Sequence, residues 1–399
     1  MAITTNNKIL ILGGGLIGLA IAHELAAKGE QVEILSKSRN EAAGFVAAGM
    51  LAPHAEGLSK DLLRVGQESL KRIPGWIEKI ENESGIKCGF TLCGTIVPFL
   101  NAKDRDSYPT VDFGEILNRK ELEVEVPGIS QQWETALLFK QDGQIDNRRH
   151  LMRALEKACV NLGVQFLEGV EVIEVIHSDS IFEGVKIKNI NSEIEVIKGK
   201  KGVLCSGAWS SQIIKEIPIY PVKGQMLSVQ GPISALKRIL FGPGIYLVPR
   251  EDGLIIVGAT SEKNAGFKPG LTPFGQQELH EGIKNLLPQA NKLPQMERWW
   301  GFRPCTPDEA PILGESMHKN LWIATGHHRN GVLLTAITVE ILTKCICQEI
   351  LSPREQDILK KFQWDRFGYL QTNQSSTRHE ASEGSQSLSS EESNQRLIS

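Results

Sequence analysis

The chain has 399 residues, of which 41% are hydrophobic and 23% are charged, and its formal net charge at pH 7 is −3. A chain of this length predicts about two domains of ~150 residues each, and it excludes a peptide hormone or a lone zinc finger. Because the net charge is small, no overall electrostatic field attracts nucleic acid or a membrane surface, and we expect neither as a partner.

The seven cysteines are typical of a reducing environment. Their number is odd and no two of them form a C-x-x-C pair. They therefore predict neither a disulfide framework nor a zinc site, and we expect no metal and a cytoplasmic location. The stretch that most resembles a signal peptide or membrane span, residues 9–22, is too short to cross ~30 Å of hydrocarbon.

The N-terminal segment predicts a strand, a tight turn and a helix. Residues 8–12 form an aliphatic run and residues 13–15 are glycines, and apolar residues then recur with helical spacing over 16–27. Residues 31–35 predict a second strand, which should lie parallel to the first because a helix connects the two. A doubly wound parallel sheet is therefore expected to begin at this end of the chain.

The later segments show two kinds of pattern. One continues the first domain, with a helix predicted over 145–163, a long apolar helix over 332–347, and strands over 164–167, 170–176 and 201–205. The other, in the segments between them, is the alternation of antiparallel hairpins with many Pro and Gly turns. Its clearest case is the pair 246–250 and 254–258, joined at Asp252 and Gly253, because Asp-Gly supplies the positive φ angles of a tight hairpin.

These patterns predict an α/β fold with two domains. A Rossmann-like nucleotide-binding domain with a parallel sheet is interrupted by an inserted, mostly antiparallel α+β domain for the substrate. The segments expected in the first domain are 8–88, 144–217 and 300–367, and those expected in the second are 89–143 and 218–299. Residues 371–399 are rich in Ser, Glu, Gln and Asn, and we expect them to be disordered.

A glycine fingerprint lies where a dinucleotide would bind. Gly13, Gly15 and Gly18 follow a predicted strand and open a predicted helix, as G-x-G-x-x-G requires. Gly13 permits the tight turn, Gly15 lets the backbone approach a diphosphate, and Gly18 lets the helix pack closely on the strand. The alternative is an ordinary glycine-rich turn, which the strand and helix context disfavours.

The end of the second predicted strand lacks the acidic residue that commonly binds the adenosine ribose. Ser36 stands there, followed by Lys37, with Arg39 two residues further on. A serine is a weaker acceptor for a ribose hydroxyl than a carboxylate. The two cations suit a 2′-phosphate, so an NADP-binding alternative stays open.

Seven stretches resemble the D-amino-acid oxidase type of FAD amine oxidases, most closely the glycine oxidases of the thiamine (thiazole) pathway. They occur in family order between residue 8 and about residue 367. The stretches are KILILGGGLIGLAIAHEL, AAGMLAPHAE, VLCSGAWS, PVKGQMLSV, YLVPREDGLIIVGAT, WGFRPCTPDEAPILG and GHHRNGVLLTA. The resemblance implies a two-domain fold that binds FAD in an extended conformation.

The resemblance also implies which residues contact the cofactor. Leu16 and Ile17 join the glycines at the diphosphate, Ser36 and Lys37 lie near the ribose, and Val175 lies at the adenine. Small residues followed by a methionine lie along the cofactor, and a segment before the last apolar helix lies along the flavin ring. These are Ala43, Gly44, Ala48, Gly49 and Met50, and then His327, His328, Arg329, Asn330, Gly331, Val332 and Leu333. Neither histidine is assigned a proton-transfer role.

Three residues are implied at the substrate. Arg303 matches the arginine that binds the substrate carboxylate, Tyr246 matches the tyrosine that assists it, and Arg329 is expected nearby. A guanidinium suits this task because its donors form a planar fork. Sarcosine oxidases attach flavin covalently through a cysteine, and alignment of the run 306–309 puts Gly301 at that position, so the FAD is expected to be non-covalent.

The sequence therefore predicts an FAD-dependent oxidase of glycine that acts with dioxygen, with sarcosine and small D-amino acids as further substrates. Hydride transfer to the flavin would give an imine, then glyoxylate and ammonia, and hydrogen peroxide. Thiazole synthase is a candidate acceptor of the imine, and family resemblance implies a homotetramer. The alternatives are another FAD amine oxidase, an NAD(P)-dependent dehydrogenase and a non-catalytic flavoprotein partner.

Overall fold

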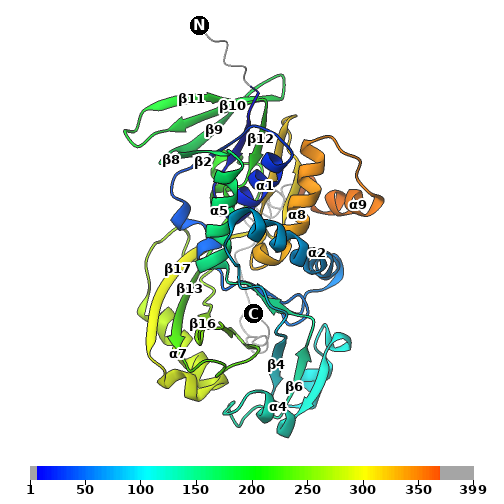
Figure 1. Ribbon diagram of the computed structural model, residues 1–399, viewed down its shortest axis with the longest axis vertical. Helices are drawn as coiled ribbons and strands as arrows, with labels where there is room; N and C mark the ends of the chain where they lie inside the picture. The colour runs from blue at the N-terminus through cyan, green and yellow to red at the C-terminus, as the bar shows by residue number, and fades with distance from the viewer. Residues whose placement is uncertain (1–6, 369–399) are drawn as a thin grey trace, which may run out of the picture.

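A mostly parallel sheet forms one half of the computed structural model, which describes residues 7–368 (Figure 1). Neighbouring strands are parallel except for one antiparallel pair at an edge, β18 with β19. In sheet order the six strands are β18 (Ile312–Glu315), β19 (Leu321–Thr325), β12 (Lys201–Leu204), β1 (Ile9–Leu12), β2 (Val32–Ser36) and β8 (Gln165–Glu168). The predicted parallel sheet is confirmed. The predicted tail at 371–399 lies outside the described residues.

The two faces of this sheet are covered differently, because side chains alternate along each strand. Ile9 and Ile11 of β1 pack into a core shared with helices, whereas Leu10 and Leu12 pack against a small antiparallel sheet. The helices are α1 (Leu16–Ala27), α2 (Lys60–Ser84), α5 (Met152–Asn161) and α8 (Gly331–Ile346), and the small sheet is β9 (Glu171–Ser178), β10 (Ile181–Lys188) and β11 (Ile194–Lys198). The first sheet thus carries helices on one face and strands on the other.

A second, mostly antiparallel sheet forms the other half of the molecule (Figure 1). Its eight strands are, in order, β17 (Gln295–Cys305), β13 (Tyr220–Gln230), β16 (Leu254–Gly258), β15 (Ile245–Pro249), β14 (Ile239–Gly242), β4 (Thr95–Phe99), β6 (Thr135–Phe139) and β5 (Glu115–Asn118). The predicted hairpin is present as β15 and β16. Strands from both predicted insertions meet where β14 pairs with β4. The bounds of the two domains stay a prediction.

The remaining elements are short or lie on the outside. They are α3 (Ala102–Asp106), α4 (Arg119–Glu125), α6 (Ser210–Ile213), α7 (Pro273–Leu286), α9 (Pro353–Phe362), β3 (Met50–Leu51) and β7 (Gly143–Gln144). The helix predicted over 145–163 is shorter than expected, because residues 147–151 form a π-helical turn before α5. Within residues 7–368 no helix is both long and apolar enough to cross a lipid bilayer.

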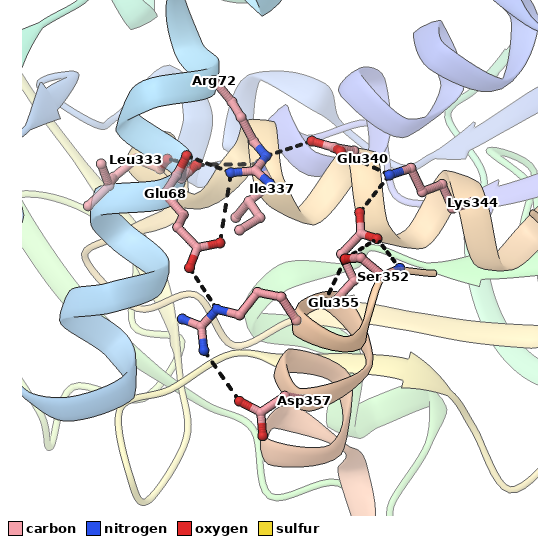
Figure 2. A network of polar contacts seen from close by, with 11 residues as sticks. Glu68, Arg72, Leu333, Ile337, Glu340, Lys344, Ser352, Glu355 and Asp357 are labelled. Atoms are coloured by element: carbon pink, nitrogen blue, oxygen red, sulfur yellow. Dashed lines mark hydrogen bonds and ion pairs between the residues drawn. The ribbon is translucent and has the colours of Figure 1, made fainter. Parts of the chain in front are cut away.

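Helix α8 is fixed by polar contacts to α2 and α9, which Figure 2 shows from close by. Arg72 of α2 pairs with Glu340 of α8 at 2.6 Å, and Lys344 of α8 pairs with Glu355 of α9 at the same distance. The Ser69 hydroxyl of α2 donates to the Leu333 carbonyl in the first turn of α8. These contacts hold α8 at its first turn, its middle and its last turn, which matters because the first turn borders the site described below.

Replacing Glu355 with glutamine is expected to lower the free energy of unfolding by about 1–3 kcal/mol at neutral pH. The Glu355 side chain is 4% exposed and also accepts hydrogen bonds from the Ser352 backbone and hydroxyl. Burial raises its pKa, but the hydrogen bonds from Lys344 and Ser352 outweigh burial and lower the pKa from 4.5 to about 2. Urea unfolding of both proteins measures the difference.

The pH dependence has a defined sign, because the folded pKa of Glu355 lies below its ordinary value. The stabilisation is complete above about pH 4.5 and is lost as the pH falls towards 2, so wild type and Glu355→Gln should converge in that window. Glu349 is a matched control, since its carboxylate pairs with Lys28 at an exposed position. Glu349→Gln should change stability by less than about 1 kcal/mol.

Candidate active site

A large cavity lies at the carboxyl ends of four parallel strands. The segments that follow β1, β2, β12 and β19 all line it, as do residues of the antiparallel sheet. Open α/β sheets bind ligands at this edge, because the loops and helix N-termini meet there. The cavity therefore joins the glycine fingerprint to the residues expected at the substrate.

The glycine turn leaves the start of α1 open to an anion. Gly13 has φ +121°, and a Cβ on it would lie 2.6 Å from the Cys205 carbonyl oxygen. A Cβ on Gly18 would lie 2.0 Å from the Gly13 carbonyl oxygen, so Gly18 serves close packing and does not line the cavity. Helix α1 has no side-chain cap and no acidic residue in its first turn. Its free N–H groups thus fit a diphosphate.

The cations expected near a 2′-phosphate are paired with carboxylates. Ser36, Lys37 and Arg39 all line the cavity. Lys37 lies 2.9 Å from Glu171, and Arg39 pairs with both Glu156 and Glu168. This pairing neutralises the charge that favoured NADP.

The residue expected at the adenine has a different position. Val175 lies further along β9, where it pairs with Val185, and it does not line the cavity. Residues 170–172, at the start of that strand, line the cavity instead. The contact of Val175 with the adenine therefore stays a prediction.

Small residues form the middle of the cavity wall. Ala43, Gly44, Ala48, Gly49 and Met50 all line it. Gly49 has φ +78°, and a Cβ there would lie 2.0 Å from the Ile145 carbonyl oxygen. The buried Arg250 guanidinium donates to the Ala48 carbonyl, which fixes this wall. A flat ring system could lie against it.

Arg303 and Tyr246 come together at the other end of the cavity. The Arg303 Nη1 donates to the Thr260 carbonyl at 3.0 Å, which orients the guanidinium. Two glycines on neighbouring strands make room: a Cβ on Gly224 would lie 2.5 Å from Arg303 Nη1, and one on Gly258 would lie 2.5 Å from the Tyr246 hydroxyl. Burial raises the pKa of Tyr246 despite the nearby Arg303 charge. Its hydroxyl therefore stays protonated and can donate to an anion.

Arg329 faces a buried carboxylate that the sequence analysis did not select. Its Nε lies 3.6 Å from Glu56 Oε2, and the Glu56 side chain is only 8% exposed. Burial raises the pKa of Glu56, and the charges of Arg329 and Arg303 oppose that rise. Glu56 also lines the cavity. Two cations, Arg303 and Arg329, and one carboxylate, Glu56, therefore border the end of the cavity where Tyr246 lies; we call this the substrate end.

Comparison with known proteins identifies the family. Residues 8–345 match the family described as FAD dependent oxidoreductase (DAO). The chain belongs to this family of FAD dependent oxidoreductases. This membership agrees with a cavity that joins a diphosphate turn to an arginine and a tyrosine.

Individual relatives carry more specific names. The chain is 38% identical over 369 residues to a protein named bifunctional protein ThiO/ThiG from Trichormus variabilis, covering 90% of this chain and 55% of that protein. The chain thus spans about half the length of that relative. It is 30% identical over 352 residues to a glycine oxidase from Geobacillus kaustophilus, covering 84% of this chain and 91% of that one.

A solved structure has the same fold. The crystal structure of glycine oxidase from Geobacillus kaustophilus superposes with a TM-score of 0.80 at 27% identity, over 86% of this chain and 95% of that one. The predicted fold class, a Rossmann-like domain with a mostly antiparallel second domain, is confirmed. The cofactor of this family is FAD.

The described residues fit FAD. The uncapped N-terminus of α1 suits its diphosphate, and the small-residue wall suits a flat ring. Helix α8 also begins at the cavity without a side-chain cap or an acidic residue in its first turn, so its positive end favours electron density on a ring beside it. Gly301 lines the cavity and carries no nucleophile, while Cys305 lies outside it, with burial raising its pKa to about 12. Both observations favour non-covalent binding.

The segment before α8 is divided between cavity and core. His327, His328, Arg329, Gly331 and Val332 line the cavity. The other two expected residues do not, since Asn330 is buried at the start of α8 and Leu333 packs in the helical core.

Both histidines of this segment are neutral at physiological pH. Burial lowers the pKa of His327 to about 4, and burial with nearby cations lowers that of His328 to about 3. His327 is held by a contact of 3.1 Å between its Nε2 and the Thr338 hydroxyl. A cationic role for either ring is therefore disfavoured. Within residues 7–368 no three His, Cys, Asp or Glu side chains are grouped to hold a metal ion.

Several cavity residues have no individual signal in the sequence. Phe241 reads as an ordinary apolar position outside the matched stretches, and Met226 and Trp209 lie inside them without being selected, yet all three line the cavity. Glu56 had a weak signal, because it closes the matched stretch AAGMLAPHAE. What marks it is burial of a carboxylate beside two arginines, and burial becomes visible only in the fold.

Proposed function

We propose that this chain is an FAD-dependent amino-acid oxidase whose preferred substrate is glycine. The observation that carries the proposal is a cavity that begins at the uncapped end of α1 and ends at Arg303 and Tyr246. The names of the relatives support it, since glycine oxidases are similar over most of both chains. The two arginines and the tyrosine that line this cavity suit an anion.

In this proposal Arg303 binds the substrate carboxylate and the Tyr246 hydroxyl donates to the same group. A charge-assisted contact of this kind contributes about 1.5–3 kcal/mol. The two contacts fix the distance and angle of the α-carbon to the cofactor, and this orientation is the chain's main contribution to catalysis. FAD, when bound, supplies the hydride acceptor, and dioxygen reoxidises it to give hydrogen peroxide.

The imine product leads either to glyoxylate and ammonia or to a second enzyme. We propose thiazole synthase as the acceptor, supported by the bifunctional ThiO/ThiG name of relatives about twice as long as this chain. Cytoplasmic location is supported by seven free cysteines in the structure. A homotetramer is proposed from family resemblance, and light scattering of the purified protein tests it.

Purified protein tests the proposal directly. An oxidised-flavin absorption spectrum separates an FAD enzyme from an NAD(P)-dependent dehydrogenase, because nicotinamide lacks that visible band. A peroxide assay across glycine, sarcosine, D-alanine and D-proline ranks the substrates. The largest kcat/KM is expected for glycine, and a larger value for sarcosine or a D-amino acid would assign the chain to one of those oxidases. A yellow protein that forms no peroxide with any of them would be a non-catalytic flavoprotein.

A further inference from the structure

Glu56 is a buried carboxylate that the proposed chemistry leaves without a task. It lines the cavity, and its side chain is 8% exposed. Within residues 7–368 its Oε2 has no hydrogen-bond partner, because Arg329 Nε at 3.6 Å is too distant to donate. A buried acceptor that lacks a hydrogen-bond donor lowers the stability of the folded protein. The site therefore offers an unused acceptor to whatever binds there.

The chain just before Glu56 is held by several hydrogen bonds, which fix the point from which its side chain enters the cavity. The Ala55 N–H donates to Asp142 Oδ2 at 2.9 Å, and His54 Nδ1 lies 2.6 Å from Asp142 Oδ1. Gln67 contacts the other ring nitrogen of His54 at 3.0 Å, and the Tyr108 hydroxyl donates to the Ala55 carbonyl. The backbone next to Glu56 is thus held by groups outside the cavity.

The charges around Glu56 complement a zwitterion. Arg303 and Arg329 supply two positive charges and Glu56 supplies one negative charge. A substrate carboxylate that pairs with Arg303 leaves Arg329 and Glu56, whose charges balance, and of these two only Glu56 can accept a hydrogen bond from the other end of a short ligand. An amino group is the donor that such a carboxylate binds most strongly.

We propose that Glu56 binds the amino group of the substrate and takes its proton when it arrives as an ammonium ion. In that step one N–H bond breaks, its electron pair stays on nitrogen, and the proton forms an O–H bond on Glu56. The amine is then neutral, as hydride removal from the α-carbon requires. Glu56 thereby selects amino acids over carboxylates that lack an amine. This inference rests on the proposed function.

Glu56→Gln tests the inference with two ligands that share a carboxylate and differ in the amine. The kcat/KM for glycine should fall about 10- to 100-fold, because a charge-assisted contact is lost. The inhibition constant of acetate should stay unchanged or become lower, since a negative charge beside the arginines is gone. Glu309→Gln is the matched control. Glu309 is an exposed carboxylate outside the cavity whose charge, like that of Glu56, acts on Arg329. Its replacement should change neither kcat/KM for glycine nor the inhibition constant of acetate.

The pH profile gives a second measurement. The charged and titratable groups around Glu56 are Arg303, Arg329, Asp142, Tyr108 and Tyr246. Burial raises the pKa of Glu56, so the acid limb of kcat/KM should lie above the ordinary carboxyl range. Activity is lost as the pH falls through that limb, because the carboxylate form is needed. Glu56→Gln should abolish the limb.

The outcomes separate the inference from the proposed function. If Glu56 only neutralises Arg329, Glu56→Gln will shift glycine and acetate in the same direction and keep the acid limb, which overturns the inference alone. Wild-type protein that forms no peroxide from any amine overturns the proposed function and the inference together. Glu56→Asp is the second variant, should the glutamine variant not fold. Its shorter side chain should lower kcat/KM for glycine and leave acetate inhibition unchanged.

Discussion

Replacing Gly15 with valine should yield a folded protein that carries no flavin. A Cβ at Gly15 would meet only the Ala42 side chain, at 3.4 Å, which is an ordinary contact. The backbone there, with φ −79° and ψ −173°, also accepts a branched residue. The valine methyl groups would instead enter the cavity at the start of α1, where the diphosphate needs close backbone approach. The valine side chain should therefore clash with the bound cofactor and not with the rest of the protein.

The other two fingerprint glycines should behave differently. Valine at Gly13 or Gly18 would press on backbone atoms at 2.6 Å and 2.0 Å, so these variants should lose stability even without FAD. Gly75→Val is a matched control, because Gly75 lies exposed in α2 with nothing within 4 Å of its added Cβ.

Absorbance of released flavin and thermal unfolding of the apoproteins measure these effects. Apoproteins are compared because bound FAD itself raises the apparent stability. A Gly15→Val protein with a full complement of FAD would show that the diphosphate binds elsewhere.

The sequence predicted the glycine turn well because its determinants are local. Gly13 and Gly15 follow β1 directly, and the residues that form the tight turn before α1 are adjacent in the sequence. The hairpin of β15 and β16 was predicted for the same reason, since Asp252 and Gly253 mark its turn. Each of these features needs only a few neighbouring residues to form.

The substrate end was less predictable, because its parts are far apart in the chain. Gly224 makes room for Arg303 and Gly258 makes room for Tyr246. The sequence around each glycine does not indicate which side chain it accommodates. The long helix α2 and the small sheet of β9 to β11 were also not predicted as units. Which face of the parallel sheet they cover depends on packing between distant segments, which no local pattern records.

Helix α8 combines a local feature that the sequence predicts with a position that depends on distant residues. Its apolar sequence predicted a helix, but its angle to the cavity depends on Arg72, Ser69 and Glu355 in two other helices (Figure 2). The uncapped first turn can act on a bound ring only if the helix is held from outside. Stability in this network and electrostatics in the cavity are therefore coupled through one helix.

Replacing Arg303 with alanine should lower kcat/KM for glycine by at least about 30-fold, chiefly through KM, while the protein stays yellow. Truncating one partner of a desolvated charge pair costs about 2–5 kcal/mol, which corresponds to a factor of about 30 at the lower bound and a few thousand at the upper. Arg303 lies at the end of the cavity away from α1 and contacts the Thr260 carbonyl, so FAD content should not change. Steady-state kinetics and the visible spectrum measure both effects on one sample.

Arg303→Lys should recover less than about tenfold of that loss. A lysine keeps the charge but presents it as a compact point, without the planar fork that binds both carboxylate oxygens. The lysine side chain is also shorter than the arginine that lies over Gly224. It would leave the Thr260 carbonyl without the hydrogen bond that now orients the Arg303 guanidinium. Arg298→Ala is the matched control, since Arg298 is an exposed arginine on the same strand, outside the cavity. If Arg303→Ala and Arg298→Ala give the same KM, the carboxylate does not bind at Arg303. The proposed orientation of the α-carbon would then be wrong, even if glycine is the substrate.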